Sequence, residues 1–204
     1  MKDLGVIIDS ELKFDKHINH IVSRAQQVAN LIHKCFVSKD TNTLVQAYTT
    51  YVRPLLEYAS SVLSPHSVVL VKKIESDQRR FTKRISRCDK LNCCSRLAKL
   101  GIDSLELRRL RFGLISTYKI LFGLMDTSPD SFISQCTSRA KRGHSLKIFA
   151  PQSSSIDAHK YFFSRRVIQC WNDLPACDET FTSFASFKQL LNKVDLTAVV
   201  GGLA

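Results

Sequence analysis

The stretch Val68-VLVKKIESDQRRFTKRISRCD-Lys90 carries the strongest structural signal in this 204-residue sequence. Read at about 100° per residue, it gathers one narrow, mainly apolar face at spacings of three and four: Val71, Ile74, Gln78, Phe81 and Ile85. The opposite side carries seven cations: Lys72, Lys73, Arg79, Arg80, Lys83, Arg84 and Arg87. The pattern predicts a helix whose apolar stripe packs on a core while its cations point outward.

Positive charge is concentrated around this stretch. The chain has a formal net charge of +12, and the segment from Lys72 to Phe112 holds 13 Lys or Arg against 5 Asp or Glu, a net of +8. A charged helix face is often simply solvated, but such faces usually mix the two signs. Clustering of one sign favours a polyanionic partner such as nucleic acid.

Length and composition indicate a globular chain. A length of 204 residues suits one substantial domain or two small ones, and the apolar content of 44% is ordinary. No apolar run approaches the roughly 18 residues of a membrane-spanning helix, and the apolar core of residues 1–10 is too short for a signal peptide. We therefore expect no membrane partner and an intracellular location, in the nucleus and cytoplasm.

Upstream of this stretch, the sequence predicts one strand followed by helices. Leu4–Asp9 has the branched residues of a strand, which we expect to pair within a sheet. A helix should follow to about Phe36, with Asp15 as its N-cap and Phe14 as a hydrophobic staple. Asp40 should cap a second helix, and Pro54 should kink or end it.

Downstream, two further helices are expected before the composition becomes more polar. A short helix should end at Gly101, and the capping-box spacing of Asp103 and Glu106 should open a long helix to about Gly123. The last third should hold a helix ending at Trp171 and a final helix capped by Ser183 or Ser186. The expected fold is mostly α: a helical bundle with a short N-terminal strand and a smaller mixed C-terminal region. We divide it into residues 1–14, 15–125 and 126–204.

Enzyme motifs are missing from the sequence. It has no GxGxxG, GxxxxGK[ST], GxSxG or HExxH, and Asp178-Glu179 is its only adjacent acidic pair. A zinc site would draw on Cys88, Cys93, Cys94 and His144, but these lack the close ligand pairs of structural zinc sites. A general-base role for His144 is also disfavoured, because a histidine in a basic loop more often bonds backbone or phosphate.

The last third offers two weaker binding features. A glycine turn with donors around it could cradle an anion, or could be an ordinary basic loop: Arg142, Gly143, His144, Ser145 and Lys147. Aromatic residues interleave with Arg165 and Arg166 and could stack bases, although such residues more often form a small core: Tyr161, Phe162, Phe163 and Trp171.

A series of short phrases along the chain resembles the region after the polymerase palm in reverse transcriptases of non-LTR (LINE-like) retrotransposons. The first phrases are Leu4-GVII-Asp9, Tyr51-VRPLLEYA-Ser60 and Gln78-RRF-Thr82. Later phrases follow in the same order, through Leu100-Gly101-Ile102, Ser104-Leu105-Glu106, Arg142-GH-Ser145 and Trp171-NDL-Pro175 to Phe187-Lys188. The resemblance covers nearly the whole chain.

This resemblance implies a fragment of an RNA-directed DNA polymerase. Residues 1–14 would end the palm, 15–125 would be the thumb domain, and 126–204 would be a C-terminal extension that contacts nucleic acid. The family's catalytic aspartates and their Mg ions belong to the palm, so the chain itself would need no cofactor, bind no metal and not polymerise DNA alone. Its partners would be the primer-template duplex, the element RNA and the palm and fingers domains.

Both lines of reasoning lead to one hypothesis, with two alternatives. We expect the cations of the Val68–Lys90 helix, with Arg142, His144 and Lys147, to bind the backbone of nucleic acid without catalysing a reaction. The first alternative is a basic helical scaffold that binds an acidic protein surface. The second is an inactive remnant of a mobile element.

Overall fold

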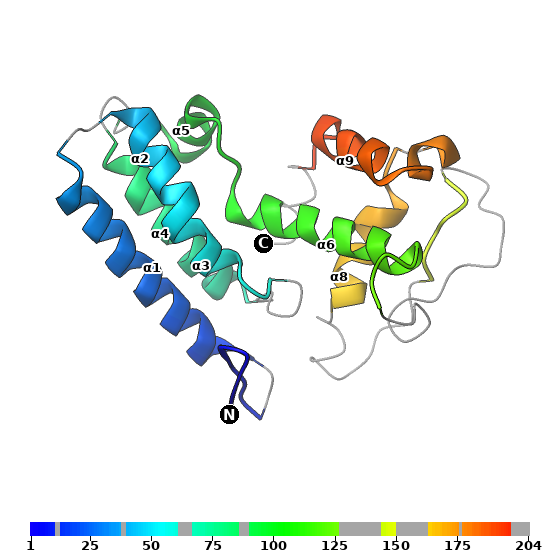
Figure 1. The fold of residues 1–204 in the computed structure, drawn as a ribbon, viewed down its shortest axis with the longest axis horizontal. Helices are drawn as coiled ribbons and strands as arrows, with labels where there is room; N and C mark the ends of the chain where they lie inside the picture. The colour runs from blue at the N-terminus through cyan, green and yellow to red at the C-terminus, as the bar shows by residue number, and fades with distance from the viewer. Residues whose placement is uncertain are drawn as a thin grey trace. The chain divides into compact units, whose positions relative to one another are not determined.

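The computed structural model describes residues 1–10, 13–37, 40–60, 67–85, 90–126, 144–149, 163–175 and 177–196 (Figure 1). These residues are mostly helical, with a two-stranded sheet at the N-terminus, which confirms the expected fold class. Packing divides the chain into two compact units, Met1–Arg109 and Leu110–Ala204. The boundary lies inside one helix, α6 (Leu105–Leu121), and the expected division near Met125 stays a prediction.

The N-terminus is a hairpin. Strand β1 (Lys2–Asp3) pairs antiparallel with β2 (Val6–Ile7), and the turn between them is Leu4-Gly5. Both turn residues have positive φ, 43° and 84°, as in a type I′ hairpin turn. The strand expected over Leu4–Asp9 is present but shorter, at Val6–Ile7, because Leu4 and Gly5 turn the chain and the strand pairs with the segment just before them.

Helix α1 (Asp15–Cys35) begins differently from the expectation. Phe14, the residue before it, has left-handed backbone geometry with φ 59°, and no side chain caps the helix from that position. The Asp9 carboxylate instead accepts hydrogen bonds from the backbone N–H groups of Lys13 and Phe14, at 2.9 and 3.1 Å. The prediction that Asp15 is the N-cap was wrong, since a more distant aspartate binds the turn that leads into the helix.

The second helical segment continues past Pro54. Asp40 caps α2 (Thr41–Ala47) through the N–H of Thr43 at 2.9 Å, as the sequence predicts. A π-helical turn, η1 (Tyr48–Val52), then leads directly into α3 (Arg53–Glu57), which holds Pro54 in its first turn. Proline lacks the N–H that a continuous α-helix would use, and the wider π turn accommodates that loss.

Helix α4 (Val68–Lys83) lies where the apolar stripe predicts it. Of that stripe, all but the half-buried Val71 are buried. Gln78, its one polar member, donates from its amide to the backbone carbonyl of Asp103 at 2.9 Å. A buried amide is costly without a partner, and this hydrogen bond explains why a polar residue is tolerated there.

Two further helices complete the first unit. Helix α5 (Cys93–Leu100) is capped by Asn92 and ends at Gly101, whose φ is 65°. At the start of α6, the N–H of Leu107 bonds Ser104 Oγ at 3.2 Å, and the N–H of Glu106 bonds the Glu75 carboxylate at 2.8 Å. The predicted capping role of Asp103 was therefore wrong: Ser104 takes it, with help from α4.

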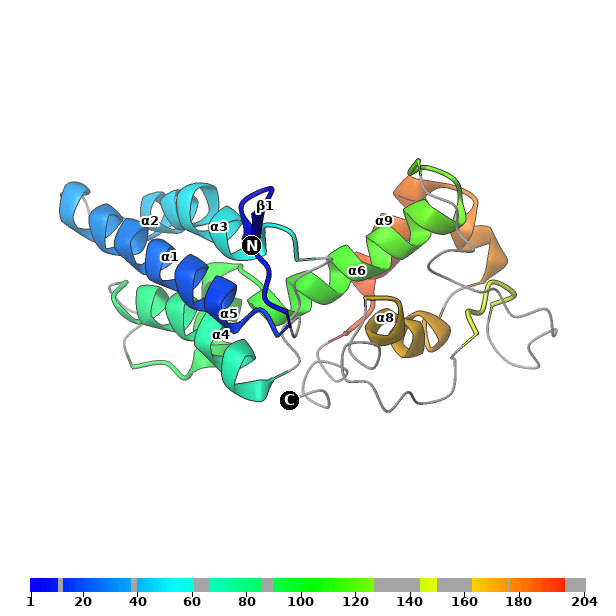
Figure 2. The same ribbon diagram turned by 90° about the horizontal axis from the view of Figure 1, so that it is seen from below.

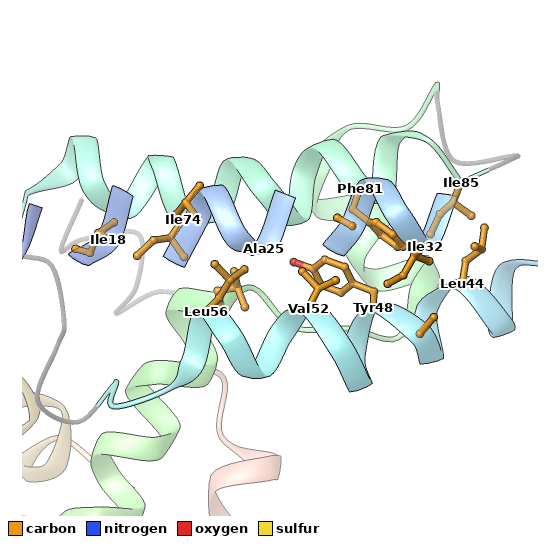
Figure 3. Close-up of a cluster of buried hydrophobic side chains, with 14 of the residues drawn as sticks. Ile18, Ala25, Ile32, Leu44, Tyr48, Val52, Leu56, Ile74, Phe81 and Ile85 are labelled. Carbon is orange, nitrogen blue, oxygen red and sulfur yellow. The ribbon is translucent and has the colours of Figure 1, made fainter. Parts of the chain in front are cut away.

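The core of the first unit lies between α1, α4 and the α2–η1–α3 segment. Figure 3 shows its apolar side chains pointing toward one another: Ile18, Ala25, Ile32, Leu44, Tyr48, Val52, Leu56, Ile74, Phe81 and Ile85. The rings of Tyr48 and Phe81 lie 4.6 Å apart. This packing fixes the rotation of α4 about its own axis and so decides which of its residues reach solvent.

The second unit has an aromatic core of its own. The unit contains α8 (Phe163–Asn172), the 3-10 turn η3 (Asp178–Phe181) and α9 (Phe184–Lys193) (Figure 2). Ser183 caps α9. Trp171 and Phe187 are fully buried, and Tyr118 donates to the Phe181 carbonyl at 2.9 Å. Trp171 is thus a core residue and does not stack bases; Tyr161 and Phe162 lie outside the described residues.

None of the described helices combines the length and the apolar character that crossing a membrane requires.

The core predicts a clear asymmetry between two identical substitutions in the first unit. Leu56 is fully buried, so Leu56→Ala should lower the free energy of unfolding by about 2–5 kcal/mol through lost burial and a cavity. Leu31 is 57% exposed, and Leu31→Ala should change it by less than about 0.5 kcal/mol. Urea denaturation followed by circular dichroism measures both. Equal effects would contradict this packing.

Candidate nucleic-acid interface

Six of the seven cations expected on the central helix are described, and all six are exposed: Lys72, Lys73, Arg79, Arg80, Lys83 and Arg84. Arg87, the seventh, lies outside the described residues, as does Arg142. No ion pair joins any of the six to a carboxylate within the described part of the chain. Their charges are therefore not neutralised by direct acidic neighbours there.

The six cations form two rows along α4. At 100° per residue, Lys72, Arg79 and Lys83 fall opposite the buried stripe, and we call them the outer row. The inner row lies on the flank of the helix: Lys73, Arg80 and Arg84. Each row repeats at spacings of seven and four residues, about 10.5 and 6 Å along the helix axis.

Helix α1 lies beside the inner row. Lys73 donates from Nζ to Asn19 Oδ1, and Arg84 donates from Nη1 to Asn30 Oδ1 at 2.8 Å. Both pairs are separated by 54 residues in sequence, so α1 and α4 run parallel at a fixed register. Arg80 and Gln26 are also 54 residues apart in sequence, and both line one small hollow between the helices.

The acidic residues of α4 find hydrogen-bond partners within the fold, although Asp77 lines the same hollow as Arg80. Glu75 binds the N-terminal turn of α6. Asp77 is 2% exposed, and its carboxylate accepts a hydrogen bond from the Tyr48 hydroxyl at 3.5 Å. The exposed surface of α4 consequently has one sign of charge, because its carboxylates are bound within the fold.

The hollow between α1 and α4 is too small for a base or a phosphate. Its volume is about 10 Å³, roughly what one water molecule needs, and Asp77, Arg80, Phe81 and Arg84 contribute to its wall. Burial raises the pKa of Asp77 to about 6, although Arg80 and the Tyr48 hydroxyl act in the opposite direction. The hollow is thus a place where a buried carboxylate can change its charge near neutral pH.

The loop predicted to bind an external anion binds a carboxylate of the chain itself, that of Asp178. Ser145 donates to Asp178 Oδ1 from both its backbone N–H and its hydroxyl, each at 2.9 Å. These two hydrogen bonds hold the pKa of Asp178 below its usual range. The two donors of Ser145 are therefore already occupied, and Lys147, half-buried, is the described cation left beside them.

His144 is a core residue. Its ring is 2% exposed, its Nε2 lies 3.0 Å from the Trp171 carbonyl, and it packs edge-on against the Trp171 indole. Trp171 in turn donates from Nε1 to the Leu146 carbonyl at 2.8 Å, while the Asn172 amide exchanges two hydrogen bonds with the backbone of Ile148. The phrase Trp171-Asn172 thus fixes this loop, and His144 does not reach a surface ligand.

The cysteines form no metal site in the described structure. Cys93 and Cys94 lie in the first turn of α5 as free thiols, and Cys88 is outside the described residues. Across the described ranges, no three His, Cys, Asp or Glu side chains gather closely enough to hold a metal ion.

Comparisons with known proteins give similarity without a function. No family model matches the chain, and no solved structure matches it. It is similar to an uncharacterized protein of Caenorhabditis elegans, with 29% identity over 126 residues. The match covers 60% of this chain and 64% of that protein, so it spans less than two thirds of the relative's length.

Sequence reasoning missed Asn19 and Asn30 as members of this surface. Their only signal is a spacing of eleven residues, the same as that between Lys73 and Arg84. Such a match becomes meaningful only once two helices are known to run parallel in register.

The buried carboxylate of Asp77 predicts a pH-dependent stability. Because its folded pKa lies above the ordinary value of 3.8, the unfolded chain releases this proton first and stability falls as pH rises from about 4 to about 6. Asp77→Asn should therefore raise the free energy of unfolding by about 1–3 kcal/mol near pH 7.5 and change it little near pH 3.5. Urea denaturation at both pH values tests this. The exposed Asp3→Asn is the control, and an equal gain from it would contradict the prediction.

Proposed function

We propose that this chain binds the sugar-phosphate backbone of a primer-template duplex, as the thumb and C-terminal part of a non-LTR retrotransposon reverse transcriptase. The palm and fingers domains and the element RNA would be its other partners. The observation that carries the proposal is the surface of α4, where six exposed cations have no carboxylate paired with them among the described residues. The family assignment itself depends on the ordered phrases of the sequence.

The geometry of α4 suits a phosphate backbone better than a base edge. Phosphate contacts position a protein without reading sequence, and they need cationic donors at regular spacing on a rigid support. Helix α4 has such a spacing in both rows, and the core fixes it from below through Ile74 and Phe81. A polymerase thumb must hold a duplex of any sequence, and a rigid cationic helix meets that need.

Neutral partners of the inner row also favour this function. Lys73 and Arg84 bond amide oxygens of α1, which orient the cations but leave their charge in place. A surface built only for solubility would gain more from carboxylates at these positions, since ion pairs with exposed lysine and arginine are slightly favourable. The arrangement keeps positive charge exposed along the helix.

Salt dependence tests the proposal directly. Each phosphate neutralised releases counterions, so the slope of log K against log salt should be about −0.9 for every contact. The outer-row double variant Arg79→Ala/Lys83→Ala should make the slope for an RNA–DNA duplex less steep by about 1.8 and weaken binding. Fluorescence anisotropy over a salt series measures both quantities for the full chain.

The control removes the same charge from α9. Lys188 and Lys193 are exposed in the second unit, and Lys188→Ala/Lys193→Ala should leave the slope unchanged. Salt-independent binding by the unaltered chain, or equal effects of the two double variants, would overturn the proposal. Tight binding to an acidic protein surface without binding to duplex would favour the scaffold alternative.

A further inference from the structure

The two asparagines beside the inner row have a defined orientation. Lys73 and Arg84 carry only hydrogen-bond donors, so the atom that faces each of them must be the amide oxygen of Asn19 or Asn30. The amide nitrogen of each asparagine then carries two N–H donors that its cation does not use. Both asparagines are exposed, so these donors are open to solvent.

The α1–α4 seam therefore presents donors alone at these positions. We define the seam as Asn19 and Asn30 of α1 with Lys73 and Arg84 of α4. The two acceptor oxygens are used within the pairs, which leaves ammonium, guanidinium and amide N–H groups facing outward. A phosphate group offers only acceptors and complements such a set. A carboxamide or a hydroxyl, which needs both donors and acceptors, fits it less well.

We propose that Asn19 and Asn30 bind phosphate together with Lys73 and Arg84, so that α1 is the second helix of the nucleic-acid interface. This inference rests on the proposed function and adds ligand residues to it. Each asparagine would donate from its amide nitrogen to a phosphate oxygen that its partner cation also contacts. The site would be specific for phosphate and indifferent to base sequence.

The spacing of the two pairs indicates two separate phosphates. Eleven residues of helix separate Asn19 from Asn30, which is about 16.5 Å along the axis. A strand of duplex carries a phosphate about every 3.4 Å of its axis, and the distance between the two pairs is several times that repeat. The two pairs are therefore too far apart to contact the same phosphate. Because the two pairs are far apart, their contributions should be independent of each other.

Ordering of the cations is a second consequence of the seam. Lysine and arginine side chains lose rotamer freedom when they bind a ligand, and this loss lowers affinity. In the seam, the hydrogen bonds to α1 already restrict Lys73 and Arg84 in the free protein. Part of the loss of side-chain entropy therefore occurs on folding and does not lower the affinity for phosphate.

Removing the asparagines tests the inference without changing net charge. Asn19→Ala and Asn30→Ala should each weaken binding to a labelled RNA–DNA duplex of about 20 base pairs roughly fivefold, and together roughly 25-fold. The salt slope should stay near that of the unaltered chain, because no phosphate-neutralising cation is lost. The matched control, Asn42→Ala/Gln46→Ala, removes two exposed amides from α2 and should bind like the unaltered chain.

An aspartate at the same place tests whether binding tolerates a negative charge beside Arg84. Asn30→Asp keeps an oxygen that can accept from Arg84 but replaces the donor N–H₂ with a negative charge. If Asn30 donates to phosphate, this variant should bind more weakly than Asn30→Ala. The control Gln46→Asp introduces the same charge on α2 and should have a much smaller effect. Circular dichroism and a thermal melt confirm that each variant folds.

The outcomes separate this inference from the proposed function. If the unaltered chain shows no salt-dependent duplex binding, the proposed function fails and the inference fails with it. If it binds with a steep salt slope but the alanine variants at Asn19 and Asn30 match the α2 control, the inference alone is overturned. Alanine variants of Asn19 and Asn30 that weaken binding at an unchanged salt slope support both the proposed function and this inference.

Discussion

The packing of one face of α4 against α1 and η1 determines the rest of the first unit. Ile74, Phe81 and Ile85 enter a core shared with Tyr48 and the apolar side of α1. Once this face is buried, the helical repeat alone decides where the other residues of α4 point. The cations reach solvent because they occupy the remaining faces, and their two rows follow from the same rotation.

This packing also gives the acidic residues of α4 partners inside the fold, while its cations stay exposed. Glu75 and Asp77 lie near the edges of the buried face, where each finds a donor inside the fold: a backbone N–H of α6 and the hydroxyl of Tyr48. Burying Asp77 is unfavourable for its charged form, as its raised pKa indicates. The fold keeps these carboxylates inside, and the exposed surface remains cationic.

The sequence predicted what depends on periodicity and missed what depends on distant contacts. Helix α4, the Asp40 cap and the stop at Gly101 are local patterns, and the structure confirms them. The start of α1 depends on Asp9 and the start of α6 on Glu75, which no helix-start motif includes. His144 illustrates the same limit, since its basic neighbours suggested a phosphate ligand while Trp171 holds its ring in a core.

Two donor-rich sites in this chain show why local composition does not identify an anion-binding surface. Around Ser145, the N–H and hydroxyl donors converge on the Asp178 carboxylate, so the site is complete within the protein. Along the α1–α4 seam, the cations meet only amide oxygens of Asn19 and Asn30, which orient them without cancelling their charge. The Ser145 donors are used within the fold, whereas the seam keeps net charge and spare donors exposed. The difference lies in the partner that each donor finds, and this is why we propose the interface on α4 and α1 and not on the basic loop.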